Sequence, residues 1–378
     1  MARTALQDWL AALLRSETPG FPTDEDPGDL EQLVTAHGVG SLVHEALADN
    51  AVGREVPGHF RVWLKELAMA EAAAELARAE EIKGVLADLR RSGVEMLVIK
   101  GTALAYSLYP RPALRPRGDT DLWIRPADRQ KVDQVLRKRG YETGLSAGGE
   151  TAVRQLAYSL HTAKGIAHSL DVHWNLTDSP LLREAFSRDE AVHAALPVPA
   201  LGEEILTLGH AHALLFACVH RIKHRHSPYY VGSKAQFEPD RLIWLYDLRL
   251  LAEALDEPGW RVVLDSAERG RVRAVVADGL AAARQLVGAE IPDWVMSTLT
   301  APGVGEPSSR LLRSGHVGAF FADLASFKPA DRVRYLRDVL FPPRAYMREK
   351  YANSRAPLAW LYLRRIISGV GKRISGNL

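Results

Sequence analysis

Apolar and polar positions divide the chain into a central part with strand-like patterns and two flanking parts with helical patterns. Over the first ninety residues, and again after residue 196, apolar positions recur at the three- and four-residue spacing of amphipathic helices. Between these parts, short apolar or alternating runs predict strands at residues 94–99, 119–124, 155–162 and 166–174. The pattern predicts an α+β protein with an N-terminal helical region (1–90), a small mixed-sheet core (91–195) and a C-terminal helical region (196–378).

Composition narrows the class of protein without changing this picture. Of the 378 residues, 47% are hydrophobic and 25% are charged, which is the balance of an ordinary globular protein. The formal net charge of +2 argues against a dedicated nucleic-acid-binding protein. Cys218 is the only cysteine, which excludes an intrachain disulfide and fits a reducing cytoplasm. No run approaches the roughly 18 apolar residues of a membrane span, so we expect a cytoplasmic protein without a transmembrane segment.

Two carboxylates on one predicted strand carry the clearest chemical signal. Asp119 and Asp121 are separated by one residue, so their side chains point to the same face of the strand. Because like charges repel, such a pair is favoured where a divalent cation lies between the carboxylates, and Mg²⁺ prefers oxygen ligands. Taken alone, a pair of this kind is more often a solvated feature of a loop. Its meaning therefore depends on the neighbouring segments.

The segment before this strand has the features of a phosphate-binding turn. A predicted strand ends at Lys100, and Gly101 and Thr102 begin a helix whose free N–H groups suit a phosphate. Thr102 adds a hydroxyl donor, while Arg115 and Arg117 add positive charge. Helix capping and a solvated basic loop explain these residues equally well when each is taken alone. Their combination with an acidic pair that begins 18 residues after Gly101 favours a nucleotide site.

Together these segments resemble the nucleotidyltransferase signature of the DNA polymerase β-like superfamily. In that signature a glycine followed by glycine or serine begins a helix, and a later strand carries two acidic residues separated by one position. Gly101-Thr102 and Asp119-x-Asp121 correspond to these elements, with Lys100 where many relatives have another glycine. More narrowly, LVIKGTALAYSLYP and LRPRGDTDLWIRP are similar to a large, poorly characterised family of bacterial nucleotidyltransferases. Toxin-type nucleotidyltransferases of abortive-infection systems share the Gly-Thr-Ala-Leu turn.

The resemblance implies a third carboxylate on a following strand. Asp171, between Leu170 and Val172, has the apolar-acidic-apolar setting that the superfamily uses. His173 shares the strand face of Asp171, and we expect it to be a hydrogen-bonded neighbour of the site. Glu150 is a weaker candidate for the third carboxylate because it lies in a glycine-rich loop.

The resemblance extends into the C-terminal helical region through the segments HRIKHRH and DRLIWLYDLRLL. His220 and His224 are one helical turn apart, a spacing that suits zinc, but no glutamate follows His220 as in the H-E-x-x-H motif. We therefore expect these histidines to pack or to contact a substrate rather than to bind zinc. Lys223, Arg241 and Asp247 are expected to line the same cleft.

The resemblance implies a magnesium-dependent transfer of a nucleoside monophosphate from a nucleoside triphosphate to an acceptor, with release of pyrophosphate. Two Mg²⁺ ions, with Mn²⁺ as a substitute, would be held by Asp119, Asp121 and Asp171. The acceptor stays open between a small molecule, a protein and an RNA. The alternatives are a toxin-like enzyme that modifies tRNA or protein, and a catalytically degenerate nucleotide-binding regulatory or scaffold protein. A kinase is disfavoured because neither a P-loop nor the protein-kinase motifs are present.

The C-terminal segment is basic and contains no Asp or Glu from Lys350 onward. Apolar residues lie between its cations, at Trp360, Leu361, Leu363, Ile366 and Ile367. The commoner arrangement of such a segment is a terminal helix that packs its apolar side chains on the domain and leaves its cations in water. A membrane surface or an RNA contact is the alternative. We also hypothesise that its cations assist the binding of an anionic acceptor.

Overall fold

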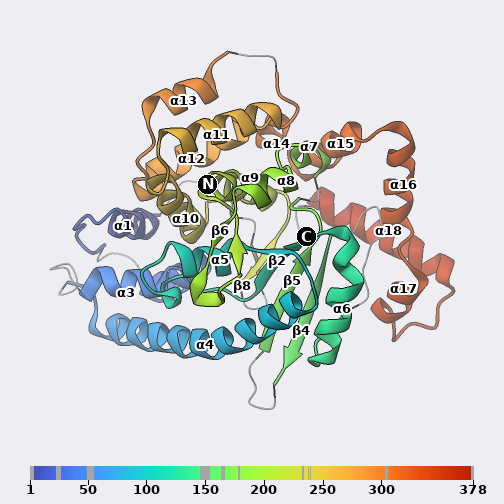
Figure 1. Cartoon of the computed structure of the whole chain (residues 1–378), viewed down its shortest axis with the longest axis horizontal. Coiled ribbons are helices and arrows are strands. Elements are labelled where there is room, and N and C mark those ends of the chain that lie inside the picture. The colour runs from blue at the N-terminus through green and yellow to red at the C-terminus, as the bar shows by residue number, and fades with distance from the viewer. Residues whose placement is uncertain are drawn as a thin grey trace.

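A computed structural model shows a mixed sheet combined with many helices, and it confirms the predicted α+β class (Figure 1). The structure describes residues 4–22, 27–48, 55–144, 154–162, 167–177, 179–231, 234–236, 238, 240–302 and 305–375. Glu150, the weaker candidate for the third carboxylate, lies outside the described residues.

The central sheet places the acidic segments of the chain on neighbouring strands. Its strands within the described residues are β1 (Met96–Ile99), β2 (Thr120–Ile124), β3 (Glu142–Thr143), β4 (Gln155–His161), β5 (Ala167–His173), β6 (Leu196–Pro197) and β7 (Leu206–Thr207). Their order in the sheet is β3-β4-β5-β2-β1-β7-β6. β2 runs antiparallel to β1 and parallel to β5, and Asp121 lies directly opposite Asp171 in the parallel pair. The strands predicted around both acidic segments are thus confirmed.

Helices precede, interrupt and follow this sheet. Within the described residues they are α1 (Ala5–Leu14), α2 (Pro27–His37), α3 (Gly40–Ala48), α4 (Gly58–Arg91), α5 (Lys100–Ser107), α6 (Arg129–Lys138), α7 (Pro180–Arg183), α8 (Arg188–His193), α9 (His210–Lys223), α10 (Leu242–Glu253), α11 (Glu257–Arg269), α12 (Arg273–Val287), α13 (Asp293–Thr300), α14 (Ser309–Arg313), α15 (His316–Ser326), α16 (Pro329–Leu340), α17 (Arg344–Lys350) and α18 (Leu358–Ser375). A separate hairpin is formed by β8 (Tyr229–Val231) and β9 (Lys234–Gln236).

The two faces of the sheet are covered by different helices. Leu122 of β2 and Val172 of β5 belong to a buried core that includes side chains of α4 and α6. Trp123, one position after Leu122, instead joins a core that contains Phe216 of α9. Because side chains alternate along a strand, Asp121 shares the α9 face with Trp123. Asp121 and Asp171 therefore lie on the face of the sheet that α9 covers.

The largest hydrophobic core joins helices from opposite ends of the chain. α1 and α3 pack with α9, α10 and α12 in one cluster whose buried members include Trp9, Val43, Leu214, Leu248 and Val276. Figure 1 shows α1 close to α10 at one end of the molecule. The N-terminal and C-terminal helical regions thus share a core next to the sheet, while the domain boundaries at residues 90 and 195 stay a prediction.

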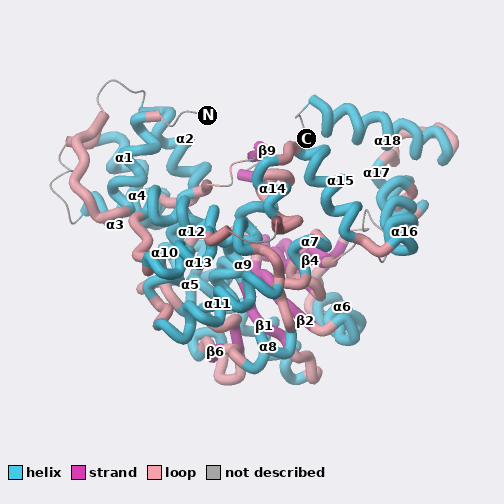
Figure 2. The backbone as a smooth tube through the Cα atoms, turned by 90° about the horizontal axis from the view of Figure 1, so that it is seen from above, coloured by secondary structure: helices cyan, strands magenta, loops and turns pink. Residues whose placement is uncertain are grey.

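The C-terminal helices α15–α18 extend on the side of the molecule opposite to α1–α3 (Figure 2). In α18, Leu361 is buried, whereas Trp360, Leu363 and Ile367 are 56%, 46% and 62% exposed. The expectation that this segment packs its apolar side chains on the domain is therefore wrong for these three residues. The physical reason is that α18 has apolar side chains on two faces and only the Leu361 face is covered by described residues. In the described part of the chain, no helix combines the length and hydropathy needed to cross a bilayer.

Replacing Leu361 by alanine is expected to destabilise the C-terminal helices, whereas replacing Leu363 by alanine is not. Loss of a fully buried leucine side chain costs about 2–5 kcal/mol, while an exposed substitution usually changes stability by less than about 0.5 kcal/mol. Thermal unfolding followed by circular dichroism compares the two variants with the wild type. Equal losses in both variants would contradict the orientation of α18 described above.

Candidate functional site

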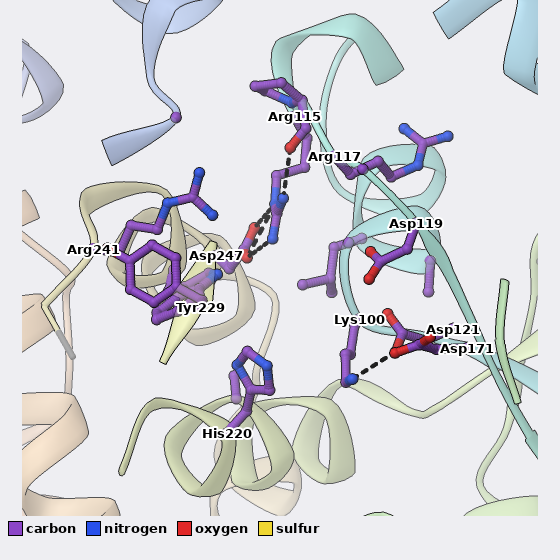
Figure 3. A pocket seen from close by; sticks show the side chains of 18 of the residues that line it. Lys100, Arg115, Arg117, Asp119, Asp121, Asp171, His220, Tyr229, Arg241 and Asp247 are labelled. Atoms are coloured by element: carbon purple, nitrogen blue, oxygen red, sulfur yellow. Dashed lines mark hydrogen bonds and ion pairs between the residues drawn. The ribbon is translucent and has the colours of Figure 1, made fainter. Parts of the chain in front are cut away.

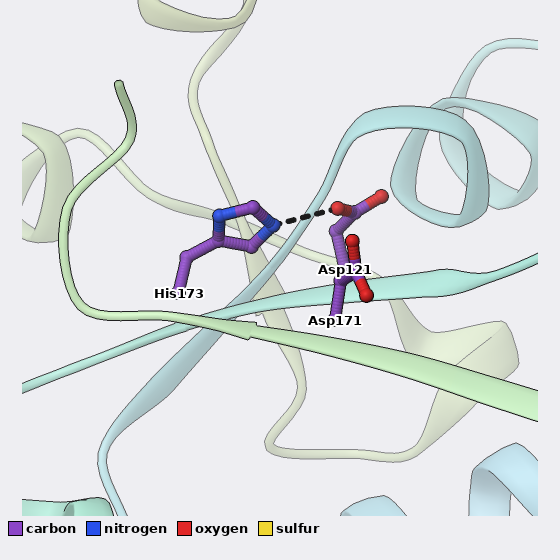
Figure 4. A group of neighbouring side chains, drawn as sticks. All are labelled: Asp121, Asp171 and His173. Atoms are coloured by element: carbon purple, nitrogen blue, oxygen red, sulfur yellow. Dashed lines mark hydrogen bonds and ion pairs between the residues drawn. The ribbon is translucent and has the colours of Figure 1, made fainter. Parts of the chain in front are cut away.

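Acidic side chains from two neighbouring strands converge on the face of the sheet that α9 covers. Asp121 and Asp171 are partners in the parallel register of β2 and β5, and His173 follows two residues later on the same face. One potential ligand atom from each of these three residues lies within 4.8 Å of the others (Figure 4). Asp119 comes directly before β2 and lines the same cavity. Carboxylate oxygens gathered in this way are the ligands that Mg²⁺ prefers.

The carboxylates of this cluster differ in how their negative charge is compensated. Burial alone would raise the pKa of Asp121, but the charge of Lys100 and a hydrogen bond from His173 outweigh burial and lower it to about 2. The negative charge of Asp121, together with burial, raises the pKa of Asp119 to about 7. Burial and the same negative charge raise the pKa of Asp171. The cluster therefore carries more negative charge than the neighbouring cations neutralise, and this excess favours binding of a further cation.

Lys100 lies at the junction of β1 and α5 and reaches into the acidic cluster. Its Nζ donates a hydrogen bond to Asp121 Oδ1 at 2.5 Å and lies 3.3 Å from His173 Nε2 (Figure 3). Its backbone φ is +56°, in the left-handed region, which costs a residue with a side chain roughly 1–2 kcal/mol. The sequence pattern assigns this lysine to the nucleotide, whereas the structure places its ammonium group against a carboxylate.

The turn predicted to bind phosphate lies at the beginning of α5. Thr102 is fully buried, and its Oγ1 lies 2.9 Å from Thr120 Oγ1 and accepts a hydrogen bond from Arg117 Nε at 2.8 Å. The hydroxyl therefore connects α5 to β2 and is turned away from the cavity that Gly101 lines. What remains available to a phosphate is the backbone N–H groups of the turn.

Both arginines of the loop after α5 form buried ion pairs with residues distant in the sequence. Arg115 makes a bidentate pair with Asp247 of α10, with Nε–Oδ1 and Nη2–Oδ2 distances of 2.9 and 2.8 Å (Figure 3). The Tyr109 hydroxyl donates to the same carboxylate at 2.8 Å. Arg117 pairs with Glu75 of α4, with an Nη1–Oε2 distance of 2.6 Å. The two guanidinium charges, which the sequence pattern assigns to the phosphates, are thus compensated by carboxylates. The ion pairs anchor the loop to α10 and α4.

A cavity of about 940 Å³ separates the acidic cluster from the helices of the C-terminal region. The wall opposite the carboxylates, called the helical wall below, contains His220 of α9 and Trp244 of α10. His224 directly after α9, Tyr229 of β8 and Arg241 directly before α10 complete it. Figure 3 shows this wall across the cavity from the carboxylates. The volume is near the upper end of the range of about 300–1,000 Å³ for small-molecule sites, so more than one reactant fits.

His220 of α9 and His224, the residue directly after this helix, form a hydrogen-bonded pair. A carbonyl oxygen only accepts, so His224 Nδ1 carries a proton and donates it to the carbonyl of Ser227 at 3.1 Å. His224 Nε2 then accepts a hydrogen bond from His220 Nε2 at 3.2 Å. Burial, followed by the charge of Lys223, lowers the pKa of His224 to about 4, and burial lowers that of His220 well below its usual value. Within the described residues, neither histidine belongs to a group of three potential metal ligands.

Arg241 is a cation of the helical wall whose charge is not compensated by a carboxylate among the described residues. Its Nε donates to the carbonyl of Ala36 at 2.8 Å, and its guanidinium lies 5.2 Å from the centre of the Tyr229 ring. Burial and the charge of Arg115 lower its pKa to about 10. A partly desolvated cation in this position favours an anionic group of a substrate.

Comparison with known proteins identifies the family of this chain. A family described as an uncharacterised nucleotidyltransferase matches residues 23–288, which is more than half of the chain. The chain belongs to this family. The matched region contains every described residue that lines the cavity, from Thr35 to Asp247. No curated protein matches the chain. Membership in a nucleotidyltransferase family implies that one substrate is a nucleotide.

Helix α4 and strand β4 supply residues in and beside the cavity that no sequence motif singled out. Glu71 and Arg78 of α4 line the cavity, and Glu75 between them holds the loop arginine described above. Residues 71, 75 and 78 have the spacing i, i+4 and i+7, so they share one face of α4. This row of charged residues is the sequence feature that could have pointed to them. In β4, Gln155 Nε2 donates to Asp171 Oδ2 at 2.8 Å.

Replacing Asp247 of this nucleotidyltransferase by alanine is expected to lower the free energy of unfolding by about 3–5 kcal/mol, because Arg115 is then buried without a partner. The two side chains are only 5% and 7% exposed. Glu257→Ala is the matched control, since its pair with Arg261 is more than 60% exposed on both sides, and it should cost less than about 1 kcal/mol. Urea denaturation measures both losses. An unchanged midpoint in Asp247→Ala would show that the pair does not anchor the loop.

Proposed function

We propose that this protein transfers a nucleoside monophosphate from a nucleoside triphosphate to an acceptor hydroxyl, in a magnesium-dependent reaction on a polymerase β-like core. The observation that carries the proposal is the convergence of Asp119, Asp121 and Asp171 beside the first turn of α5. Family membership supports a nucleotide as the donor. The oxygen donors of the cluster and its uncompensated negative charge fit a divalent cation.

The same three carboxylates would hold Mg²⁺, with Mn²⁺ as a substitute. Magnesium bound there supplies positive charge that offsets the negative charge of the reacting phosphates. The backbone N–H groups around Gly101 would bind the terminal phosphates of the nucleotide. Arg78 lines the cavity and has no hydrogen-bond or ion-pair partner among the described residues, so it is the side chain we assign to the leaving pyrophosphate.

In the proposed reaction the acceptor oxygen attacks the α-phosphorus, the bond from that phosphorus to the bridging oxygen breaks, and pyrophosphate leaves. Asp171 would take the proton of the acceptor hydroxyl, and its raised pKa supports a role as a base. His173 and Gln155 would position the carboxylates. His173 Nε2 donates to Asp121 Oδ1 at 2.7 Å, and Gln155 Nε2 donates to Asp171.

Replacing Asp119, Asp121 or Asp171 by asparagine is expected to abolish transfer, because each change removes a negative charge from the metal site without changing the size of the side chain. The protein is incubated with each of the four ribonucleoside triphosphates, Mg²⁺ and a cell extract, and the masses of the products are determined. An added nucleoside monophosphate supports the proposal, while an added phosphate or no product contradicts it. Glu142→Gln, which alters an exposed carboxylate of the same sheet, is the control and should retain full activity.

Thermal stability should respond differently in two of these variants. Asp119→Asn relieves the repulsion from Asp121, so its melting temperature in EDTA should equal or exceed that of the wild type. Asp121→Asn leaves Lys100 without the carboxylate that it contacts, so its melting temperature should fall. Differential scanning fluorimetry measures both shifts, and a fall of equal size in the two variants would contradict this account of the cluster.

A further inference from the structure

Lys100 combines a strained backbone conformation with a position inside the acidic cluster. Among the described residues, Ser16, Lys100 and Arg271 have a side chain together with a positive φ, and of these only Lys100 lines the cavity. Glycine adopts this conformation without strain. The chain therefore has a lysine at a position where glycine would adopt the backbone conformation without strain. This indicates that the lysine side chain has a functional role in the cavity.

The ammonium group of Lys100 fills the space that a metal ion bound by Asp121 and His173 would need. Nζ is 2.5 Å from Asp121 Oδ1 and 3.3 Å from His173 Nε2. A metal ion lies about 2.0–2.2 Å from its oxygen and nitrogen ligands, and an ammonium group in contact with both atoms excludes it. The hydrogen bond at 2.7 Å between the histidine and the carboxylate adds to this exclusion. Because the carboxylate only accepts, His173 Nε2 carries the proton and has no lone pair for a metal.

The charges of the cluster agree with a single additional cation. When Asp119, Asp121 and Asp171 are ionised, the ammonium of Lys100 compensates one carboxylate and leaves two negative charges. One divalent ion neutralises these two charges in the absence of nucleotide. A second divalent ion at the same groups would leave an excess of positive charge in a partly buried site, where unbalanced charge is costly.

The geometry points to Lys100 as the permanent occupant of one of two cation positions, so that the site binds one divalent ion in place of the two that the polymerase β-like resemblance implies. That ion is held by Asp119, Asp171 and the remaining oxygen of Asp121. The inference rests on the proposed function, because it concerns the cations of the same site. The centre of the Phe216 ring lies 6.0 Å from Nζ, and the face of an aromatic ring favours a cation.

Counting the Mn²⁺ ions bound by the nucleotide-free protein tests this inference. Electron paramagnetic resonance measures free Mn²⁺ during a titration of the full-length chain. The wild type should bind one ion, and Lys100→Met, which keeps a side chain of similar length without the charge, should bind two. Lys223→Met removes another lysine of the same cavity and should still bind one. Two ions in the wild type, or one ion in folded Lys100→Met, would overturn the inference.

A second variant and a second readout keep the test valid if Lys100→Met folds poorly. Lys100→Gly removes the charge and also relaxes the backbone, and it should likewise bind two Mn²⁺ ions. In EDTA its melting temperature combines the loss of the Lys100 charge with the relief of backbone strain, so the readout is the rise caused by Mn²⁺, which should be larger than in the wild type. A rise equal to or smaller than that of the wild type would reject the inference.

These outcomes are independent of whether transfer is observed. A wild-type chain that binds one ion and transfers no nucleotide would contradict the proposed function alone. A chain that transfers nucleotide with two bound Mn²⁺ ions would contradict the role of Lys100 alone.

Discussion

Repulsion between carboxylates is the interaction around which the rest of this structure is arranged. The parallel register of β2 and β5 holds Asp121 directly opposite Asp171, and neither strand can shift by one residue without moving its apolar side chains out of the core. Hydrogen bonds from neighbouring residues reduce the free-energy cost of this repulsion. Lys100 and His173 donate to Asp121, and Gln155 donates to Asp171. The sheet thus fixes a group of charges that opposes folding and favours a bound cation.

The surroundings of this group are fixed by ion pairs that connect one loop of the central part to both helical regions. The loop between α5 and β2 is attached to α10 through Arg115 and Asp247, and to α4 through Arg117 and Glu75. Thr102 joins the same loop to the start of α5. The orientation of the turn at the start of α5 relative to the sheet therefore depends on helices that contribute no carboxylate to the acidic cluster.

Local patterns in the sequence predicted what depends on local geometry. Alternation along a strand was enough to place Asp171 and His173 on one face, because the side-chain period of a strand is the same wherever the strand lies. The partners of charged residues could not be predicted in this way. Asp247 is 132 residues from Arg115, and no local pattern distinguishes a solvated arginine from one buried against such a distant carboxylate. The same limit applies to Leu363 in α18, since helical spacing shows that two apolar faces exist but not which face is covered.

The order of the elements along the chain has a consequence for the growing protein. Synthesis proceeds from the N-terminus, and the segments that form the acidic face of the sheet emerge well before α10. Until α10 is made, Arg115 lacks its carboxylate partner and the cavity lacks the wall that carries Arg241. A ribosome-bound or prematurely ended chain that stops before α10 therefore has the acidic residues without a closed binding site. The complete lining of the cavity therefore exists only in a chain that extends through α10.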